Sequence, residues 1–168
     1  MADIEDKIIS CEDLAEIRKK HKKIAFCSGC FDVLHSGHAV FFRQCKSFAD
    51  TLVVSVGSDS VLKILKGQGR PVNPEKNRMY LLAAFQDVDY VILGEEEIRP
   101  GKINFYNTIK NLKPDIFVLN DDDSAVKEKK ALCENLGIEL KLVPRVVLPF
   151  LKKISTTEII KKIKNAEK

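Results

Sequence analysis

Two histidines in one short segment are the feature of this sequence that most directly suggests chemistry. The segment from Ser28 to His38 reads SGCFDVLHSGH and follows an apolar run that we expect to be a strand. His35 and His38 are three residues apart, so in an opening helical turn their imidazoles share a face. Gly37 removes the side chain that would keep a ligand off the backbone. Imidazole donors, free amides and a helix N-terminus would together bind an anion such as a polyphosphate.

A site of this kind suits displacement at phosphorus. In such a reaction the charge spreads over the equatorial oxygens, and positioned donors do most of the work. The protein need not supply a nucleophile. The alternative is a small zinc site or a redox pair, because Cys27 and Cys30 precede His35 and His38. The short spacing between the pairs disfavours zinc, as does the expected position of Cys27 on a buried strand.

The elements that must position these residues alternate between strands and helices. We expect strands at 24–27, 51–57, 88–93, 115–119 and 138–143, and helices at about 10–21, 38–49, 58–65, 73–86, 102–112, 124–137 and from 155. This alternation predicts a three-layer, Rossmann-like α/β domain with a parallel sheet of about five strands. Ligands of such sheets bind beyond the carboxyl ends of the strands. We expect a single domain over 1–168, with an N-terminal helix in 1–22 and a catalytic core in 23–163.

Composition and charge exclude several other classes of function. The 168 residues are 45% hydrophobic and 31% charged, which is ordinary for a soluble globular chain. The net charge of +4 comes largely from two lysine-rich runs without interleaved aromatic residues, which disfavours nucleic-acid binding. The apolar runs are too short to cross a membrane. The five cysteines, an odd number, favour reduced thiols and a cytoplasmic location.

The histidine segment resembles a known signature. Residues 29–38 match every fixed position of G-x-F-D-x-x-H-x-G-H, the HxGH signature of the cytidylyltransferase-like nucleotidyltransferases. The segment Ser155-Thr156-Thr157 is similar to the closing S-T-T signature of that family. Ser155 and Glu158 form a capping-box pattern there, and the hydroxyls and free amides suit a phosphate. The resemblance extends over roughly 23–163.

A third match narrows the likeness. Gly57-Ser58-Asp59, the run 65–74 and Arg78 look most like the adenylyltransferase domain that makes ADP-heptose from a heptose 1-phosphate. The resemblance implies transfer of a nucleoside monophosphate from ATP or CTP, with Mg²⁺, to a small phosphorylated substrate, and release of pyrophosphate. Glycerol-3-phosphate-type cytidylyltransferases and FAD synthases are alternatives. A protein that binds a nucleotide as a sensor, without turnover, is the non-enzymatic alternative.

The resemblance also assigns roles to residues. The expected catalytic residues are His35, His38 and Lys66. The expected nucleotide-binding residues are Ser28, Gly29, Cys30, Phe31, Gly37, His38, Asn120, Asp121, Asp122, Ser155, Thr156 and Thr157. The expected substrate-binding residues are Asp32, Asp59, Arg70 and Arg78, and Asp32 is also the candidate metal ligand. Family members are often dimers, so a homodimer is an open expectation.

Two departures from the family pattern leave the substrate open. Heptose enzymes usually have a Gly-Gly-Asp-Tyr type turn after the fourth strand, whereas this chain has Asn120 followed by three aspartates. Those acids could instead be a polar cap before the next helix, and Asp59 could be a cap beside Ser58. Family members also usually have an arginine just before the serine–threonine signature, where this chain has Lys152 and Lys153. Lys152 or Lys153 could supply that positive charge, although a lysine lacks the bidentate geometry of arginine.

Overall fold

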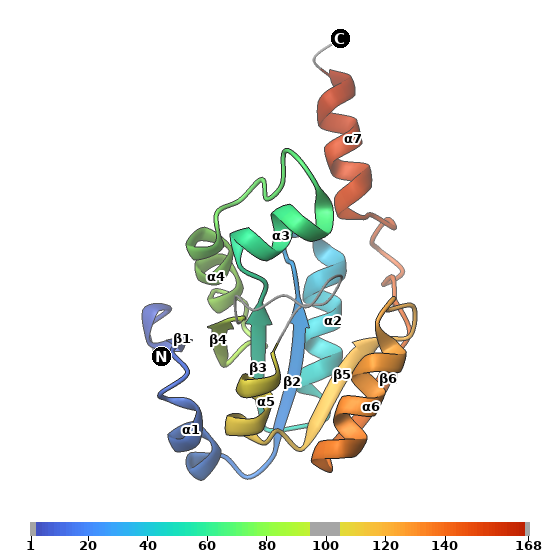
Figure 1. Cartoon of the computed structure of the whole chain (residues 1–168). Coiled ribbons are helices and arrows are strands. Elements are labelled where there is room, and N and C mark those ends of the chain that lie inside the picture. Colours follow the sequence, from blue (N-terminus) through green and yellow to red (C-terminus); the bar gives the residue numbers. More distant parts are fainter. Residues whose placement is uncertain (1–2, 95–104, 167–168) are drawn as a thin grey trace.

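The computed structural model describes residues 3–94 and 105–166 (Figure 1). The strands are β1 (Ile8–Ile9), β2 (Ile24–Gly29), β3 (Thr51–Val56), β4 (Tyr90–Leu93), β5 (Ile116–Asn120) and β6 (Glu139–Val143). The helices are the 3₁₀ turn η1 (Glu5–Lys7), α1 (Leu14–Lys20), α2 (Ser36–Lys46), α3 (Asp59–Lys66), α4 (Glu75–Ala83), α5 (Tyr106–Leu112), α6 (Val126–Leu136) and α7 (Thr156–Ala166). Strands and helices alternate along most of the chain, as the sequence predicts.

The strands form one sheet in which all described pairs are parallel. Its order is β1-β4-β3-β2-β5-β6, which confirms the predicted Rossmann-like α/β class. The sheet has six strands rather than about five, because the two residues of β1 pair with Val91 and Ile92 at one edge. From β2 the chain builds outward through β3 and β4, and then returns to place β5 on the other side of β2. This reversal is the switch point at which such folds bind ligands.

The register of β2 and β5 helps to open a crevice at the switch point. Their described pairs are Ala25 with Ile116 and Phe26 with Phe117, although β2 continues to Gly29 and β5 to Asn120. The carboxyl ends of the two central strands therefore extend beyond the residues that pair them. In Figure 1, both arrows point toward the side of the sheet where α3 crosses.

Both faces of the sheet are covered by helices. Ala25 and Cys27 of β2 belong to a core cluster with residues of α2 and α4, whereas Ile24 and Phe26 belong to a second cluster with residues of α1, α5 and α6. Alternate residues of a strand point to opposite faces, so a strand buried on both sides reads as a continuous apolar run. This is why β2 could be predicted from the sequence.

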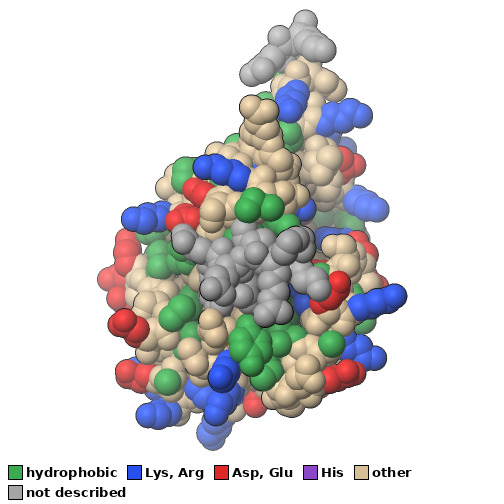
Figure 2. Space-filling model, in the orientation of Figure 1, with side chains coloured by type: hydrophobic (Ala, Val, Ile, Leu, Met, Phe, Trp, Pro, Cys, Tyr) green, Lys and Arg blue, Asp and Glu red, His purple; other side chains and the backbone are tan. Residues whose placement is uncertain are grey.

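Some element boundaries differ from the prediction. The helix after β2 begins at Ser36 rather than His38, and α4 begins at Glu75, with Pro74 rather than Asn73 at its N-cap. The first three residues of the predicted helix 102–112 lie outside the described residues, and α5 begins at Tyr106. The last helix, α7, has no buried residue and projects from the rest of the molecule (Figures 1 and 2). In the described part of the chain, no helix is both long and apolar enough to span a membrane.

Candidate active site

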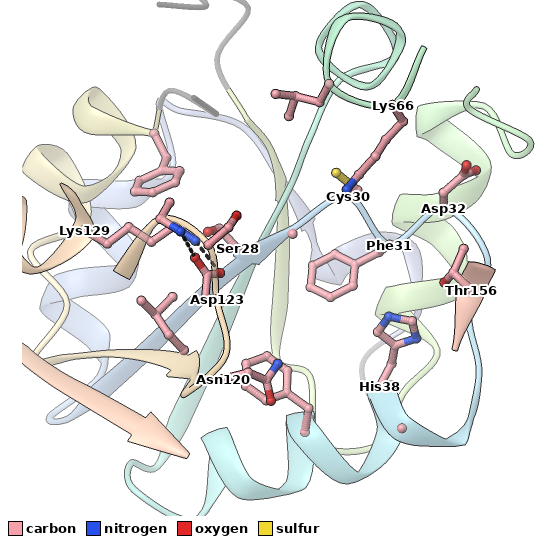
Figure 3. A pocket seen from close by; sticks show the side chains of 18 of the residues that line it. Ser28, Cys30, Phe31, Asp32, His38, Lys66, Asn120, Asp123, Lys129 and Thr156 are labelled. Carbon is pink, nitrogen blue, oxygen red and sulfur yellow. Dashed lines mark hydrogen bonds and ion pairs between the residues drawn. The ribbon is translucent and has the colours of Figure 1, made fainter. Parts of the chain in front are cut away.

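A cleft of about 910 Å³ lies at the carboxyl ends of β2 and β5. Most of the residues singled out from the sequence line it: Ser28, Gly29, Cys30, Phe31, Asp32, His35, Gly37, His38, Lys66, Arg70, Asn120, Thr156 and Thr157. Five others do not belong to its lining: Asp59, Arg78, Asp121, Asp122 and Ser155. Figure 3 shows His38, Thr156 and Lys66 around the same space. Residues more than 120 positions apart in the sequence are thus brought together.

The two histidines occupy the N-cap and first turn of α2. The Nδ1 atom of His35 accepts a hydrogen bond from the N–H of Gly37 at 3.2 Å. The Nδ1 atom of His38 accepts one from the N–H of His35, also at 3.2 Å. A neutral imidazole that accepts at Nδ1 carries its proton on Nε2. The backbone therefore selects the tautomer in which both rings have Nε2–H donors, and the ring centroids are 4.0 Å apart.

Burial keeps these imidazoles neutral. The pKa of His38 falls to about 4, because the ring is desolvated and lies near His35 and Arg145. The pKa of His35 is also lowered, first by desolvation and then by the positive charge of Arg145. At neutral pH both side chains are therefore uncharged donors. A triphosphate would meet positioned N–H groups rather than fixed positive charges at this point of the cleft.

Two glycines make this arrangement possible. A Cβ atom on Gly29 would lie 2.8 Å from Cζ of Phe31, whose own backbone has a φ of 48°. A Cβ atom on Gly37 would lie 3.0 Å from Cε1 and Nδ1 of His35. Real Cβ contacts are rarely so short, so any larger residue would displace the aromatic ring or the imidazole. The fixed glycines of the motif thus leave room for its own side chains.

The start of α7 is joined to the loop between β2 and α2. The hydroxyl of Thr156 donates to the carbonyl of Val33 at 2.9 Å. Ser155 accepts the N–H of Glu158 at 3.3 Å, which caps the helix as the sequence predicts. Thr156 and Thr157 face the cleft. The serine–threonine segment at the start of α7 thereby lies beside the histidine segment.

Asp32 holds a neighbouring loop in place. The residue is 2% exposed, and its Oδ1 accepts from the N–H groups of Val72 at 2.8 Å and Asn73 at 2.9 Å. Its Oδ2 accepts from the Nε of Arg70. Both carboxylate oxygens are therefore engaged by protein donors. Asp32 acts in this structure as the anchor of the loop that carries Arg70 to the cleft.

Arg78 is buried behind the same loop. Its guanidinium is fully buried and donates to the carbonyls of Cys30 at 2.6 Å and Asn73 at 2.9 Å, and to Oδ1 of Asp59 at 2.8 Å. The N–H groups of Arg78 therefore satisfy protein acceptors in this conformation rather than facing the cleft. The ion pair of Arg78 with Asp59 joins α4 to the start of α3. The hydrogen bond of Arg78 to the carbonyl of Cys30 holds the loop between β2 and α2.

Two cations of the cleft were not predicted from the sequence. Arg145, in the segment after β6, lines the cleft and forms an ion pair with Asp122 at 2.7 Å. Lys129 of α6 also lines it and pairs with Asp123 at 2.8 Å. Attention to the carboxyl end of β6 would have found Arg145, since that edge of a parallel sheet carries the ligand site. The local sequence does not distinguish Lys129 from a solvent-exposed lysine of a helix, so its position in the cleft could not be predicted.

The two cysteines of the CxxC pattern lie in different surroundings. Cys27 is buried in the core cluster that also contains Cys45, whereas Cys30 lines the cleft. Desolvation raises the pKa of the Cys30 thiol. None of the five cysteines forms a disulfide. Within the described residues, no group of three or more histidine, cysteine, aspartate or glutamate side chains is arranged to hold a metal ion.

Comparisons with known proteins agree with this geometry. The cytidylyltransferase-like family model matches residues 26–162, which include both signature segments. The chain is 37% identical over 150 residues to the bifunctional protein HldE of a Nitratiruptor species, covering 89% of this chain and 29% of that protein. It is 39% identical over 160 residues to HldE of Campylobacter fetus, covering 95% of this chain and 32% of that protein. The chain spans about a third of the length of the curated relatives it matches.

Solved structures extend the likeness. A lipopolysaccharide core biosynthesis protein from Thermoplasma volcanium is 30% identical with a TM-score of 0.61, covering 74% of this chain and 96% of that one. A pantoate-beta-alanine ligase from Francisella tularensis shares the fold at 18% identity with a TM-score of 0.62, covering 96% of this chain and 78% of that one. With the family match and the geometry of the cleft, the chain belongs to the cytidylyltransferase-like family of nucleotidyltransferases.

Proposed function

We propose that this chain transfers AMP from ATP to a heptose-type sugar 1-phosphate and releases pyrophosphate. The observation that carries the proposal is the pair of neutral imidazoles, whose Nε2–H donors lie at the start of α2 in a cleft shared with Thr156 and Thr157. The choice of substrate is supported by the likeness to the HldE proteins. It is also supported by the sequence around Asp59 and Arg78, which resembles that of ADP-heptose-forming domains.

In the proposed reaction an oxygen of the acceptor phosphate attacks the α-phosphorus of ATP. The new P–O bond forms as the bond from the α-phosphorus to the bridging oxygen breaks, and pyrophosphate leaves with that electron pair. His35 and His38 donate to the oxygens on which charge builds up. Thr157 and the backbone amides at the start of α7 bind the β- and γ-phosphates, while Thr156 holds this helix start against the carbonyl of Val33. The backbone of 28–31 passes under the nucleotide.

The cations of the cleft come from different elements. Lys66 at the end of α3 and Arg70 in the following loop line one side. Arg145 lines the cleft from the segment after β6, and its positive charge adds to desolvation in lowering the pKa of both histidines. We propose that Arg145 supplies the positive charge that was expected from Lys152 or Lys153. It would exchange Asp122 for a phosphate, since a guanidinium binds either oxyanion through paired N–H groups.

Magnesium normally accompanies a triphosphate and is held largely by its phosphates and by water. Asp32 does not fit the part of a metal ligand in this conformation, because Val72, Asn73 and Arg70 engage both its oxygens. We therefore assign no step of the reaction to a metal held by the protein. Asp32 instead acts on the reaction by fixing the loop of Arg70.

The free thiols fit a reducing compartment, and we propose a cytoplasmic location on that ground. Association into a homodimer is a further proposal from the family resemblance. Light scattering during gel filtration tests it, and a mass of one chain would contradict it.

The test of the proposed function is pyrophosphate release by the purified protein with Mg²⁺. ATP and CTP are each combined with heptose 1-phosphate, glycerol 3-phosphate or flavin mononucleotide. We expect pyrophosphate release only for the pair of ATP and heptose 1-phosphate. Release with CTP and glycerol 3-phosphate, or with ATP and flavin mononucleotide, would replace the proposed substrate. Nucleotide binding in calorimetry without release for any pair would favour a nucleotide sensor.

A further inference from the structure

One wall of the cleft carries an ion pair that the proposed phosphate chemistry does not use. Lys129 of α6 donates from Nζ to Oδ2 of Asp123 at 2.8 Å. The Lys129 side chain is 12% exposed and that of Asp123 is 25% exposed, and both residues line the cleft. In the view of Figure 3 the pair and Ser28 are on one side, and His38 and Thr156 are on the other. Charged side chains that are largely buried at the wall of a cleft are candidates for ligand binding.

The surroundings hold this pair in one orientation. The Nζ of Lys129 is 5.9 Å from the ring centroids of both Phe105 and Phe117. Oδ1 of Asp123 accepts the N–H of Ala125 at 2.8 Å. An ammonium has three donors, and each carboxylate oxygen has two acceptor sites. The pair therefore keeps both donor and acceptor capacity at the wall of the cleft.

Ser28 adds a second, independent observation. Its hydroxyl is buried and has no hydrogen-bond partner in the described part of the chain. Ser28 stands at the carboxyl end of β2 and lines the same cleft. A buried hydroxyl without a partner is destabilising, and a ligand that offers a hydrogen bond would remove that penalty. Ser55, the register neighbour of Ser28 on β3, also has a buried hydroxyl without a described partner, but of the two only Ser28 lines the cleft and can take a hydrogen bond from a ligand there.

We infer that Ser28, Asp123 and Lys129, with Phe105 beside them, bind the ring hydroxyls of the acceptor sugar. This group is called the hydroxyl-binding wall below. A hydroxyl both donates and accepts, so it can accept from the ammonium of Lys129 while a neighbouring hydroxyl donates to the carboxylate of Asp123. The apolar C–H face of a sugar ring can pack on Phe105, which lines the cleft. The inference rests on the proposed function, which supplies a phosphorylated acceptor.

The charges of the wall discriminate between acceptor classes. The ion pair of Lys129 with Asp123 carries no net charge, so it offers a further charged group of an acceptor no net attraction to offset the cost of removing that group from water. A flat apolar ring would leave donors and acceptors of the pair without water or partner, which is costly in a closed cleft. A neutral, hydroxyl-rich acceptor satisfies both. The ribose of the nucleotide offers the same chemistry, and the test below separates the two sources.

The experiment compares KM values for ATP and for heptose 1-phosphate in the wild type and in matched variants. Lys129→Met keeps the length of the side chain against the phenylalanine rings and removes the donor. Ser28→Ala removes a hydroxyl that has no described partner, so it should not lower the melting temperature. The control is Lys130→Met, since Lys130 is exposed on the same helix and pairs with Glu134 at 3.9 Å.

We expect Lys129→Met to raise the KM for the sugar phosphate by about 10- to 100-fold, as for a lost hydrogen bond to a charged group. The KM for ATP should change less than about twofold. Ser28→Ala should raise the same KM by about 3- to 10-fold. The control should match the wild type. A rise confined to the KM for ATP, or no change in either KM, would overturn the inference.

A binding measurement keeps this inference separable from the proposed reaction. Calorimetry of heptose 1-phosphate with enzyme loaded with a non-hydrolysable ATP analogue needs no turnover. Binding that Lys129→Met weakens, in a wild type that releases no pyrophosphate, would support the hydroxyl-binding wall and contradict the proposed function. Equal binding by the wild type and Lys129→Met, or no binding by the wild type, would overturn the wall even if pyrophosphate were released.

Discussion

The protonation state of His38 can be tested quantitatively. Its pKa is about 4 in the folded chain, against an ordinary value of 6.5. Between these two pH values the unfolded chain therefore binds more protons than the folded chain. The contribution of His38 to the free energy of unfolding is fully present above about pH 7 and is lost as the pH falls toward 4. The full effect is about 3 kcal/mol at about 1.4 kcal/mol per pH unit, and about 2 kcal/mol of it is lost by about pH 5.

The variant His38→Asn isolates this contribution. Asparagine can still accept the N–H of His35 but does not titrate. Urea unfolding of both proteins at about pH 7.5 and pH 5 should show about 2 kcal/mol more loss for the wild type. The chain has three histidines, so NMR titration can also follow His38 directly, with the variant providing the assignment. A titration midpoint near 6.5, or parallel stability losses, would refute the neutral-donor interpretation.

Three substitutions give contrasting expectations. Gly29→Ala should lower the free energy of unfolding in urea by about 1–3 kcal/mol, because the new Cβ would displace the ring of Phe31; unchanged stability would contradict this. Arg78→Met should lower it by about 3–5 kcal/mol, since it leaves buried carbonyls and Asp59 unpaired; lost activity at full stability would instead indicate a ligand contact. Arg145→Met should leave stability within about 0.5 kcal/mol, since its ion pair is exposed, but raise the KM for ATP about tenfold in the pyrophosphate assay; an unchanged KM would exclude its phosphate role.

The central strands and the signature segments were predictable because their signals are local. β2 and β3 are buried on both faces and so read as continuous apolar runs between turn residues. The histidine motif contains its own supporting residues, since Gly29 and Gly37 make room for Phe31 and His35. The edge strand β1 has only two residues, which is too short for any pattern to register.

Long-range pairing decided what the sequence could not show. Arg78 reads as a surface cation, but its buried partners come from positions 30, 59 and 73. Lys129 reads as a solvated helical lysine, yet Phe105 and Phe117 from other elements shelter it. Burial of a charged side chain depends on partners brought in by the fold, and neither spacing nor composition reveals them.

The central claim is transfer of the nucleotidyl group, and the fate of the α-phosphorus of ATP tests it most directly. ATP labelled at that position is incubated with the purified chain, Mg²⁺ and heptose 1-phosphate under single-turnover conditions. We predict that the label appears in a sugar nucleotide and not in pyrophosphate, and that His38→Ala slows its appearance by about 100- to 1,000-fold. Label that stays in ATP while the nucleotide is bound, or turnover in His38→Ala equal to the wild type, would contradict the claim.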